Sequence, residues 1–155
     1  MDTLSSCLSL KTKKGFRRYQ VADQVFLSHY VGGVETICIG GGGLEDKYIF
    51  AQLHLHWGNT SQVGSEHMVE GVAFPLELHL VHYNSKYSDI GEAVSHEDGL
   101  AVVGVLHHLS AEDNPSLQPL VEAARSVKVA KEKTGLSRGV TAKGLLPSVP
   151  GLFYR

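Results

Sequence analysis

The sequence predicts a mainly β fold of the α+β class, a large, twisted, mostly antiparallel sheet with short peripheral helices. Three observations support this prediction. Between residues 20 and 110 the chain consists largely of short runs rich in β-branched and aromatic residues, separated by glycine clusters. Several of these runs alternate polar and apolar side chains, as strands with one apolar face do. A convincing helical pattern follows only after residue 114.

The strands can be justified in chain order. Gly32-Gly33 separates the first two runs, and the four glycines at 40–43 predict a turn or bulge after the second. The polar stretch Gly58–Gly71 is expected to connect the third strand to the fourth. Strands are therefore expected at Val21–Val31, Val34–Ile39, Tyr48–Trp57, Phe74–Tyr83 and Leu100–Leu109.

One longer helix is expected near the end of the chain. Asn114 can cap it and Pro115 suits its first turn, and the pattern fades near Lys131. A loop is expected at 135–144, and a shorter helical turn at 89–94. The apolar stripe of the longer helix is Leu117, Leu120, Val121 and Ala124.

Length and composition predict one globular domain. The chain has 155 residues, 43% of them hydrophobic and 19% charged, with a net charge of -2. This balance gives no reason to expect nucleic-acid binding, and no apolar run is long enough to span a membrane. Residues 1–18 are basic but lack the apolar core of a secretory signal. We expect a disordered leader over 1–18, a domain over 19–155 and, by default, a cytoplasmic location.

Three histidines are the strongest functional signal. In Gln52–Trp57 strand alternation puts His54 and His56 on one face together with Gln52. In the next strand His79 shares a face with Glu77. If the two strands pair antiparallel, three imidazoles converge on one side of the sheet. Three protein ligands leave a fourth zinc position open, which is typical of a catalytic site.

The alternative is that these strands are simply half exposed, with their polar side toward solvent. Against it, each strand places a hydrogen-bonding side chain two residues before its first histidine: Gln52 before His54, and Glu77 before His79. Metal-bound histidines usually donate their second ring N–H to such a partner. The metal interpretation is therefore favoured. Ordinary surface or edge positions are expected for His96, His107 and His108.

Three motifs resemble the signature of the α-class carbonic anhydrases, in order and at the spacing of that family. They are Gln52-Leu-His-Leu-His-Trp-Gly58, Gly64-Ser-Glu-His67 and Glu77-Leu-His-Leu-Val-His82. The resemblance runs from about Gly40 to the C-terminus. It implies a zinc lyase that interconverts carbon dioxide and bicarbonate, built on a large twisted sheet.

Carried onto the matching positions, the resemblance implies that His54, His56 and His79 bind zinc, with Gln52 and Glu77 as hydrogen-bond acceptors for His54 and His79. Zinc would lower the pKa of a bound water, and the resulting hydroxide would attack carbon dioxide. Neutral imidazole ligands suit this chemistry because they leave the positive charge of the metal uncompensated.

The resemblance also implies roles around the metal. Glu66 matches the buried glutamate that accepts a hydrogen bond from a threonine hydroxyl, which in turn orients the hydroxide. His67 and His82 match structural histidines inside the domain. The apolar pocket for carbon dioxide is expected to include Val81 and Val102.

The chain also departs from the family pattern. It stops at Arg155, before the segment that carries the gatekeeping threonine. The proton-shuttle histidine of the family is expected near Asp23–Val25, where an ungapped alignment gives Gln24. His29 is nearby, but a shift in strand register would be needed to make it equivalent. We therefore expect an incomplete version of the family domain that binds zinc with weak or absent turnover.

Two alternatives stay open. One is a non-catalytic binding or matrix protein related to the anhydrases, although such members typically lose a ligand histidine and all three are retained here. The other is a structural zinc module with a fourth protein ligand. For that module the nearby candidates for a fourth ligand are poor. A glycine turn separates Cys38 from the site, and Glu77 is better used as a hydrogen-bond acceptor for His79. The sequence does not predict an oligomeric state.

Overall fold

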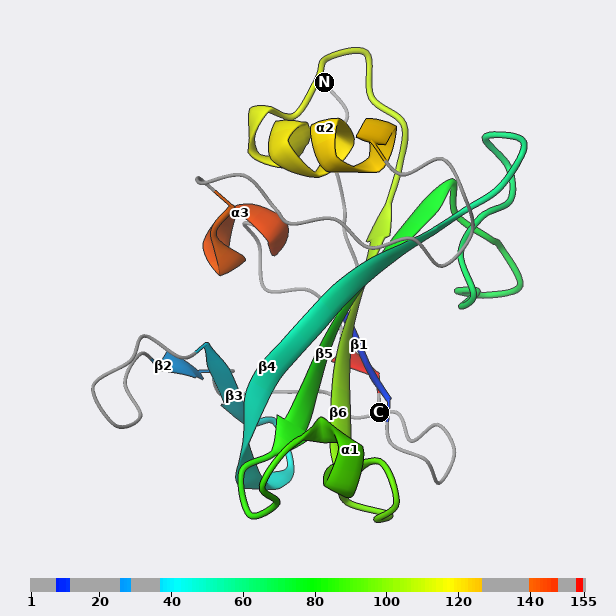
Figure 1. The fold of residues 1–155 in the computed structure, drawn as a ribbon. Helices are drawn as coiled ribbons and strands as arrows, with labels where there is room; N and C mark the ends of the chain where they lie inside the picture. Colours follow the sequence, from blue (N-terminus) through cyan, green and yellow to red (C-terminus); the bar gives the residue numbers. More distant parts are fainter. Residues whose placement is uncertain (1–7, 12–25, 29–36, 127–139, 148–152, 155) are drawn as a thin grey trace.

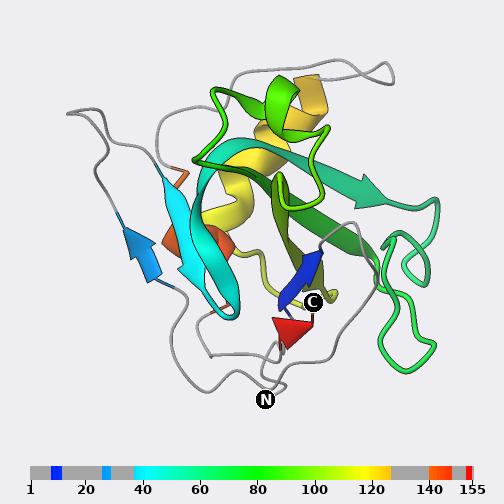
Figure 2. The same ribbon diagram turned by 90° about the horizontal axis from the view of Figure 1, so that it is seen from below.

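The computed structural model describes residues 8–11, 26–28, 37–126, 140–147 and 153–154. Within them a seven-stranded sheet runs in the order β2-β3-β4-β5-β6-β1-β7. All neighbouring strands are antiparallel except β1 and β7. The sheet is twisted and strongly curled (Figures 1 and 2), which confirms the predicted fold class. The strands are β1 Leu8–Lys11, β2 Phe26–Ser28, β3 Cys38–Gly41, β4 Leu44–Trp57, β5 Leu76–Asn84, β6 Leu100–His107 and β7 Phe153–Tyr154.

The three long central strands match the prediction closely, apart from a few residues at their ends. β4 begins four residues earlier than expected, because the glycine turn before it is tight. Of the two earlier expected strands, 21–25, 29–31 and 34–36 lie outside the described residues. Leu8–Lys11, within the expected leader, forms β1 and pairs antiparallel with β6. The remainder of the leader lies outside the described residues.

The turn between β3 and β4 needs glycine. Gly41, Gly42 and Gly43 have φ angles of 76°, 60° and 84°. Residues with a side chain rarely adopt this left-handed conformation, whereas glycine adopts it at no steric cost. The glycine cluster therefore forms the predicted turn and fixes where β4 starts.

A β-bulge in β4 decides which side chains share a face. Phe50 lies opposite His82 on β5, and Gln52 lies opposite Val81, so Ala51 is an extra residue in β4. Such a bulge shifts the alternation by one position. Apolar residues before and after it therefore lie on the same side of the sheet, which we call the core face: Tyr48, Phe50, Leu53 and Leu55.

The core lies between this face and two helices. Leu78 of β5 and Val105 of β6 are 0% and 1% exposed at its centre. Helix α2 (Gln118–Ser126) follows a 3-10 turn (Pro115–Leu117), and Asn114 caps that turn by accepting a hydrogen bond from the Ser116 N–H at 3.0 Å. Figure 1 shows α2 and α3 stacked beside one end of the sheet. The expected helix is thus confirmed to residue 126, and residues 127–131 lie outside the described part.

The expected loop at 135–144 is wrong at its end. Residues Ala142–Leu145 form helix α3, while 135–139 lie outside the described residues. The Thr141 hydroxyl caps the helix by accepting a hydrogen bond from the Gly144 N–H at 3.1 Å. Leu145 is 5% exposed and belongs to the core. Its burial stabilises a turn that is too short to show a periodic pattern in the sequence.

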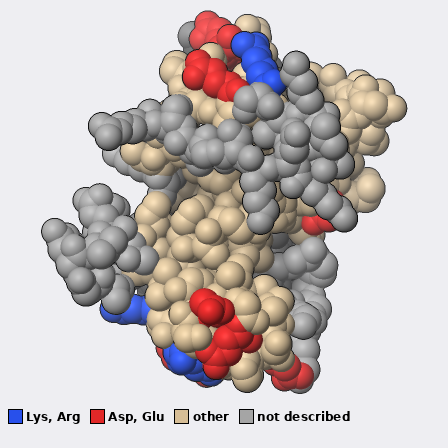
Figure 3. Space-filling view, in the orientation of Figure 1, with Lys and Arg blue, Asp and Glu red and all other residues tan. Residues whose placement is uncertain are grey.

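The opposite end of the sheet is polar. The expected helical turn there is α1 (Ile90–Ala93), whose cap Asp89 accepts a hydrogen bond from the Glu92 N–H at 2.9 Å. Lys86 and Tyr87 both donate hydrogen bonds to Asp98 nearby. In the view of Figure 3 most of the coloured charged side chains gather at the two ends of the molecule, and the described surface that is visible between them is largely uncharged. No described helix is long and apolar enough to cross a membrane.

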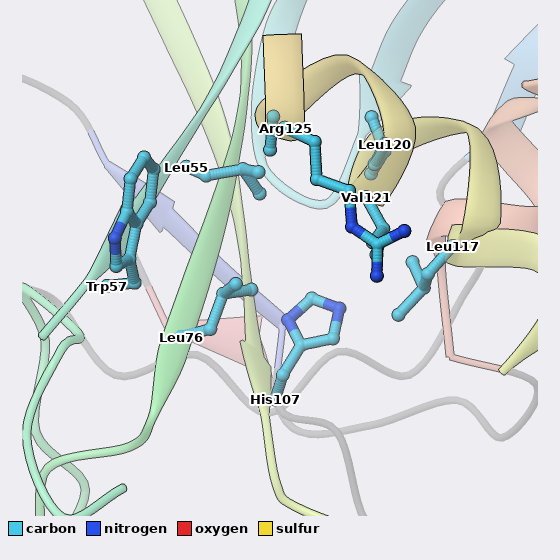
Figure 4. A pocket seen from close by; sticks show the side chains of 9 residues that line it. Leu55, Trp57, Leu76, His107, Leu117, Leu120, Val121 and Arg125 are labelled. Carbon is cyan, nitrogen blue, oxygen red and sulfur yellow. The ribbon is translucent and has the colours of Figure 1, made fainter. Parts of the chain in front are cut away.

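Helix α2 does not close completely onto the sheet. A cavity of about 350 Å³ lies between them, with Leu55 and Trp57 on one side and Leu120 and Val121 on the other (Figure 4). The guanidinium of Arg125 reaches over it from the end of the helix. This cavity is on the core face, so it is separated by the sheet from the side chains described next.

Candidate metal centre

The three predicted ligand histidines come together on the other side of the sheet, which we call the histidine face. His54 lies directly opposite His79 in the β4–β5 ladder, and His56 lies opposite Glu77. The ring centroids of the three histidines are 4.9, 5.1 and 4.7 Å apart. One nitrogen of each ring lies within 4.8 Å of the other two. The rings therefore surround a common point, as strand alternation predicts.

In His54 and His79, hydrogen bonds determine which ring nitrogen faces the point that the three rings surround. Oε1 of Gln52 lies 3.0 Å from Nδ1 of His54, and Oε1 of Glu77 lies 2.7 Å from Nε2 of His79. Both oxygens are acceptors, so the facing ring nitrogens carry the protons. This leaves the lone pairs of His54 Nε2 and His79 Nδ1 available. The partners proposed from the sequence thus orient both rings.

Glu77 is the centre of a buried hydrogen-bond network. Its side chain is 0% exposed. Besides His79, it accepts a hydrogen bond from the backbone N–H of His67 at 2.9 Å and one from the ring of His67 at 2.5 Å. Burial by itself would raise the pKa of this carboxyl, but the hydrogen bonds from His79 and His67 lower it to about 2. Glu77 is therefore ionised and acts only as an acceptor.

A buried atom without a partner provides a test of whether a metal fits. Nε2 of His56 is buried and has no hydrogen-bond partner among the described residues. A buried polar atom left unpaired costs free energy, so such an atom calls for an explanation. Burial, followed by the nearby rings of His79 and His56, lowers the pKa of His54, which favours a neutral imidazole. Neutral imidazoles with free lone pairs are the donors that Zn²⁺ prefers.

The two valines implied for the substrate pocket lie beside the histidines. Val81 is two residues beyond His79 on the same face of β5, and Val102 of β6 is directly opposite Val81. Val81 is 6% exposed, so together they form an apolar surface next to the three rings. His82 follows Val81 and therefore points to the core face, where it is 2% exposed and its ring meets Phe50 edge-on.

Glu66 also reaches the cluster, in a position that the sequence did not predict. Its Oε2 lies 3.6 Å from Nε2 of His56 and 3.9 Å from Nδ1 of His79. The side chain is 47% exposed, whereas the resemblance implies a buried glutamate. It lies in the long connection between β4 and β5, whose path strand alternation does not determine.

Two further features were missed by sequence reasoning. The hydrogen bonds from His67 to Glu77 join the connection to β5, and no periodic signal marks a loop residue as the partner of a strand residue. The described residues also offer a second potential metal-binding group, His67, Glu77 and His79. Its members already bond to one another, so it fits a metal less well. Cys38, in β3 opposite Ile49, belongs to neither group.

Comparison with known proteins supports the resemblance. The profile of the eukaryotic-type carbonic anhydrase family matches residues 19–155. The chain is 49% identical over 109 residues to carbonic anhydrase 1 of Mus musculus, covering 70% of this chain and 41% of that protein. It is 46% identical over 111 residues to carbonic anhydrase 7 of Mus musculus, with coverages of 71% and 41%. For carbonic anhydrase 1 of Oryctolagus cuniculus the identity is 44% over 110 residues, with coverages of 70% and 46%.

The matched segments therefore span less than half the length of these relatives, although they cover most of this chain. The match includes the strands that carry the three histidines and their hydrogen-bonding partners. The family profile covers well over half of the chain and agrees with the observed sheet. This chain belongs to the eukaryotic-type carbonic anhydrase family.

Proposed function

We propose that His54, His56 and His79 hold a zinc ion and that the chain uses it for the reversible hydration of carbon dioxide to bicarbonate. The observation that carries the proposal is the arrangement of three ring nitrogens within 4.8 Å of one another, two of them freed by hydrogen bonds at the opposite ring nitrogen. Zinc bound there would act as a Lewis acid that lowers the pKa of water.

The contribution of the protein is to orient two of the three rings through hydrogen bonds. Glu77 accepts the Nε2 proton of His79, and Gln52 accepts the Nδ1 proton of His54. His67 anchors Glu77 from the connecting loop. These hydrogen bonds orient the rings of His54 and His79 before a metal binds, and such preorganisation favours both affinity and catalysis.

The substrate is expected to rest against Val81 and Val102. Carbon dioxide is apolar and small, so an apolar wall can hold it weakly without competing for the metal. Val81 and Val102 face each other across the β5–β6 ladder, next to the position where His79 meets His54. The apolar surface therefore lies two residues along β5 from His79, which is one of the three proposed ligands.

Stopped-flow measurement of carbon dioxide hydration tests the proposal. The zinc-loaded chain should accelerate hydration above the uncatalysed rate, and a chelator should abolish the effect. The His56→Ala variant should lose the acceleration, while His96→Ala, which changes an exposed histidine stacked on Tyr87, should retain it. Hydration that does not depend on zinc or on His56 would contradict the proposal.

A further inference from the structure

Part of the connection between β4 and β5 folds into an arm, which we define as residues 65–74. At its base Ser65 and Phe74 exchange two hydrogen bonds. The Ser65 N–H donates to the Phe74 carbonyl oxygen at 2.9 Å, and the Phe74 N–H donates to the Ser65 hydroxyl oxygen at 2.9 Å. At its tip Val69 and Val72 form a β-bridge. Figure 1 shows the connection turned back on itself beside the ends of β4 and β5. The arm is therefore held at both ends.

The base of the arm packs closely against the segment that leads into β5. Phe74 is 8% exposed, and its ring meets that of His108 edge-on, with ring centroids 4.7 Å apart. A Cβ atom added to Gly64 would lie 2.1 Å from the carbonyl oxygen of Pro75, so this approach of two backbones needs glycine. Ser65 directly follows Gly64 and is therefore held close to the start of β5.

The hydroxyl of Ser65 connects the base of the arm to the hydrogen-bond network of Glu77. Besides accepting from Phe74, it donates to the carbonyl oxygen of His67 at 2.6 Å. The backbone N–H of His67 donates to Oε2 of Glu77 at 2.9 Å, and its ring Nδ1 donates to Oε1 at 2.5 Å. Oε1 also accepts from Nε2 of His79 at 2.7 Å. A continuous path of hydrogen bonds therefore runs from Ser65 to a proposed metal ligand.

His67 matters in this path because it binds both oxygens of the Glu77 carboxylate. A carboxylate held by one donor alone can rotate about that bond, whereas donors on both of its oxygens fix its plane. Both donors come from one loop residue, so the backbone and the ring of His67 must each be in place. The Ser65 hydroxyl fixes the backbone of His67 at its carbonyl group.

We propose that Ser65 is a positioning residue of the metal centre. Its hydroxyl fixes His67 so that both oxygens of Glu77 are held, and Glu77 then keeps Nδ1 of His79 directed at the metal. Ser65 acts only through these residues and contacts neither metal nor substrate. The inference rests on the proposed function, because it requires His79 to be a metal ligand.

Histidine NMR and zinc affinity together test the inference without relying on activity. In the metal-free chain at about pH 8, above the ordinary pKa of histidine, long-range ¹H–¹⁵N spectra should show His67 as the Nδ1–H tautomer, because its Nδ1 faces a carboxylate oxygen. The His67→Gln variant assigns the signal. In Ser65→Ala, His67 should become a mixture of both tautomers.

Zinc affinity, measured by competition with a chromogenic chelator, should fall about 10-fold in Ser65→Ala, the lower end of the range for a lost outer partner. Ser65→Thr keeps a hydroxyl and should restore both the tautomer and the affinity. Unchanged methyl signals of Leu78 and Val105, in the core, would show that the variants are folded.

The matched control is Ser61→Ala, which removes an exposed hydroxyl from the same connection and should behave like the wild type in both measurements. A Ser65→Ala chain in which either the His67 tautomer or the zinc affinity stays unchanged would overturn the role of Ser65. In particular, a lower affinity with an unchanged tautomer would mean that the hydroxyl does not act through His67. A wild-type chain that binds no stoichiometric zinc would overturn the three-histidine site instead. That failure is read from the wild type alone, so the two are distinguishable.

Discussion

Glu77 and Leu78 are neighbours on β5, and both side chains are 0% exposed, yet they face opposite sides of the sheet. Leu78 packs among apolar side chains of the core face, where close contact is sufficient. Glu77 lies on the histidine face, where each carboxylate oxygen is held by N–H groups of His67 or His79. An apolar side chain can be buried wherever it fits and packs, whereas a buried charge also needs specific hydrogen-bond partners.

Each face also holds one buried ring nitrogen without a hydrogen-bond partner among the described residues. It is Nε2 of His56 on the histidine face and Nδ1 of His82 on the core face. Of the two histidines, only His56 belongs to a group of side chains that could hold a metal ion. His56 is therefore the one whose missing partner a bound metal could supply.

The largest effect is expected on the histidine face. His79→Ala removes a ligand from the proposed site, and zinc affinity should fall by more than about 100-fold, since even the loss of an outer partner can cost that much. Competition with a chromogenic chelator measures the affinity. His96→Ala is the control and should leave it unchanged. Equal affinities in the two variants would show that the metal binds elsewhere.

On the core face the expected effect is on stability. Leu78→Ala leaves a cavity at a fully buried position, so the free energy of unfolding should fall by about 3 kcal/mol. Urea denaturation followed by circular dichroism measures it. Leu109→Ala, at a side chain that is 69% exposed, should change it by less than about 0.5 kcal/mol. A small loss for Leu78→Ala would mean that the core face relaxes around the gap.

A polar residue on the core face gives the third prediction. Burial lowers the pKa of His82 from 6.5 to about 4. Between these values the unfolded chain binds a proton that the folded chain does not. Stability should therefore be complete above about pH 6.5 and fall as the pH decreases toward 4, by about 3 kcal/mol from this residue.

Urea denaturation of the metal-free chain at pH 7, 5.5 and 4 measures this dependence. In His82→Leu the loss over this range should be smaller by that amount. The lowered pKa values of His54 and His107 act in the same direction, but they are present in both chains, so the difference isolates His82. Identical pH profiles would show that His82 is protonated without unfolding.

The smallest effect is expected for the residue that orients a ligand. Glu77→Gln keeps the shape of the side chain but removes its charge, and zinc affinity should fall by about 10- to 100-fold. Glu45→Gln, at an exposed position of β4, should leave the affinity unchanged. If Glu77→Gln bound zinc as tightly as the wild type, the hydrogen bond to His79 would have no influence on the metal.

Much of the fold could be predicted because it depends on local pattern. The alternation of Leu53, Leu55 and the histidines fixed β4 and its two faces, and Asn114 and Pro115 marked the start of the helical segment. Helix α3 could not be predicted, because four residues show no period. Strand β1 was missed for a similar reason. Its four residues form a strand because they pair with β6, and the sequence of such a short segment does not indicate a long-range pairing.

The part of the site that lies in strands could be predicted from the sequence. Spacing alone placed His54, His56 and His79 together, and placed Gln52 and Glu77 beside them. The loop residues could not be placed in this way. His67 and Glu66 lie in the β4–β5 connection, where the backbone has no regular repeat. Their contacts with Glu77 and with the histidines are therefore known only from the folded structure.

The bulge at Ala51 has a consequence for how this chain can change. Because Ala51 is the extra residue between Phe50 and Gln52, it alone keeps the aromatic side chains before it and the leucines after it on one side. Deleting a single codon there would leave every ligand in the gene. It would nevertheless turn either the histidines or the preceding core residues to the wrong side of the sheet. The arrangement of the three histidines therefore depends on the length of β4 at this point as well as on the identity of the histidines.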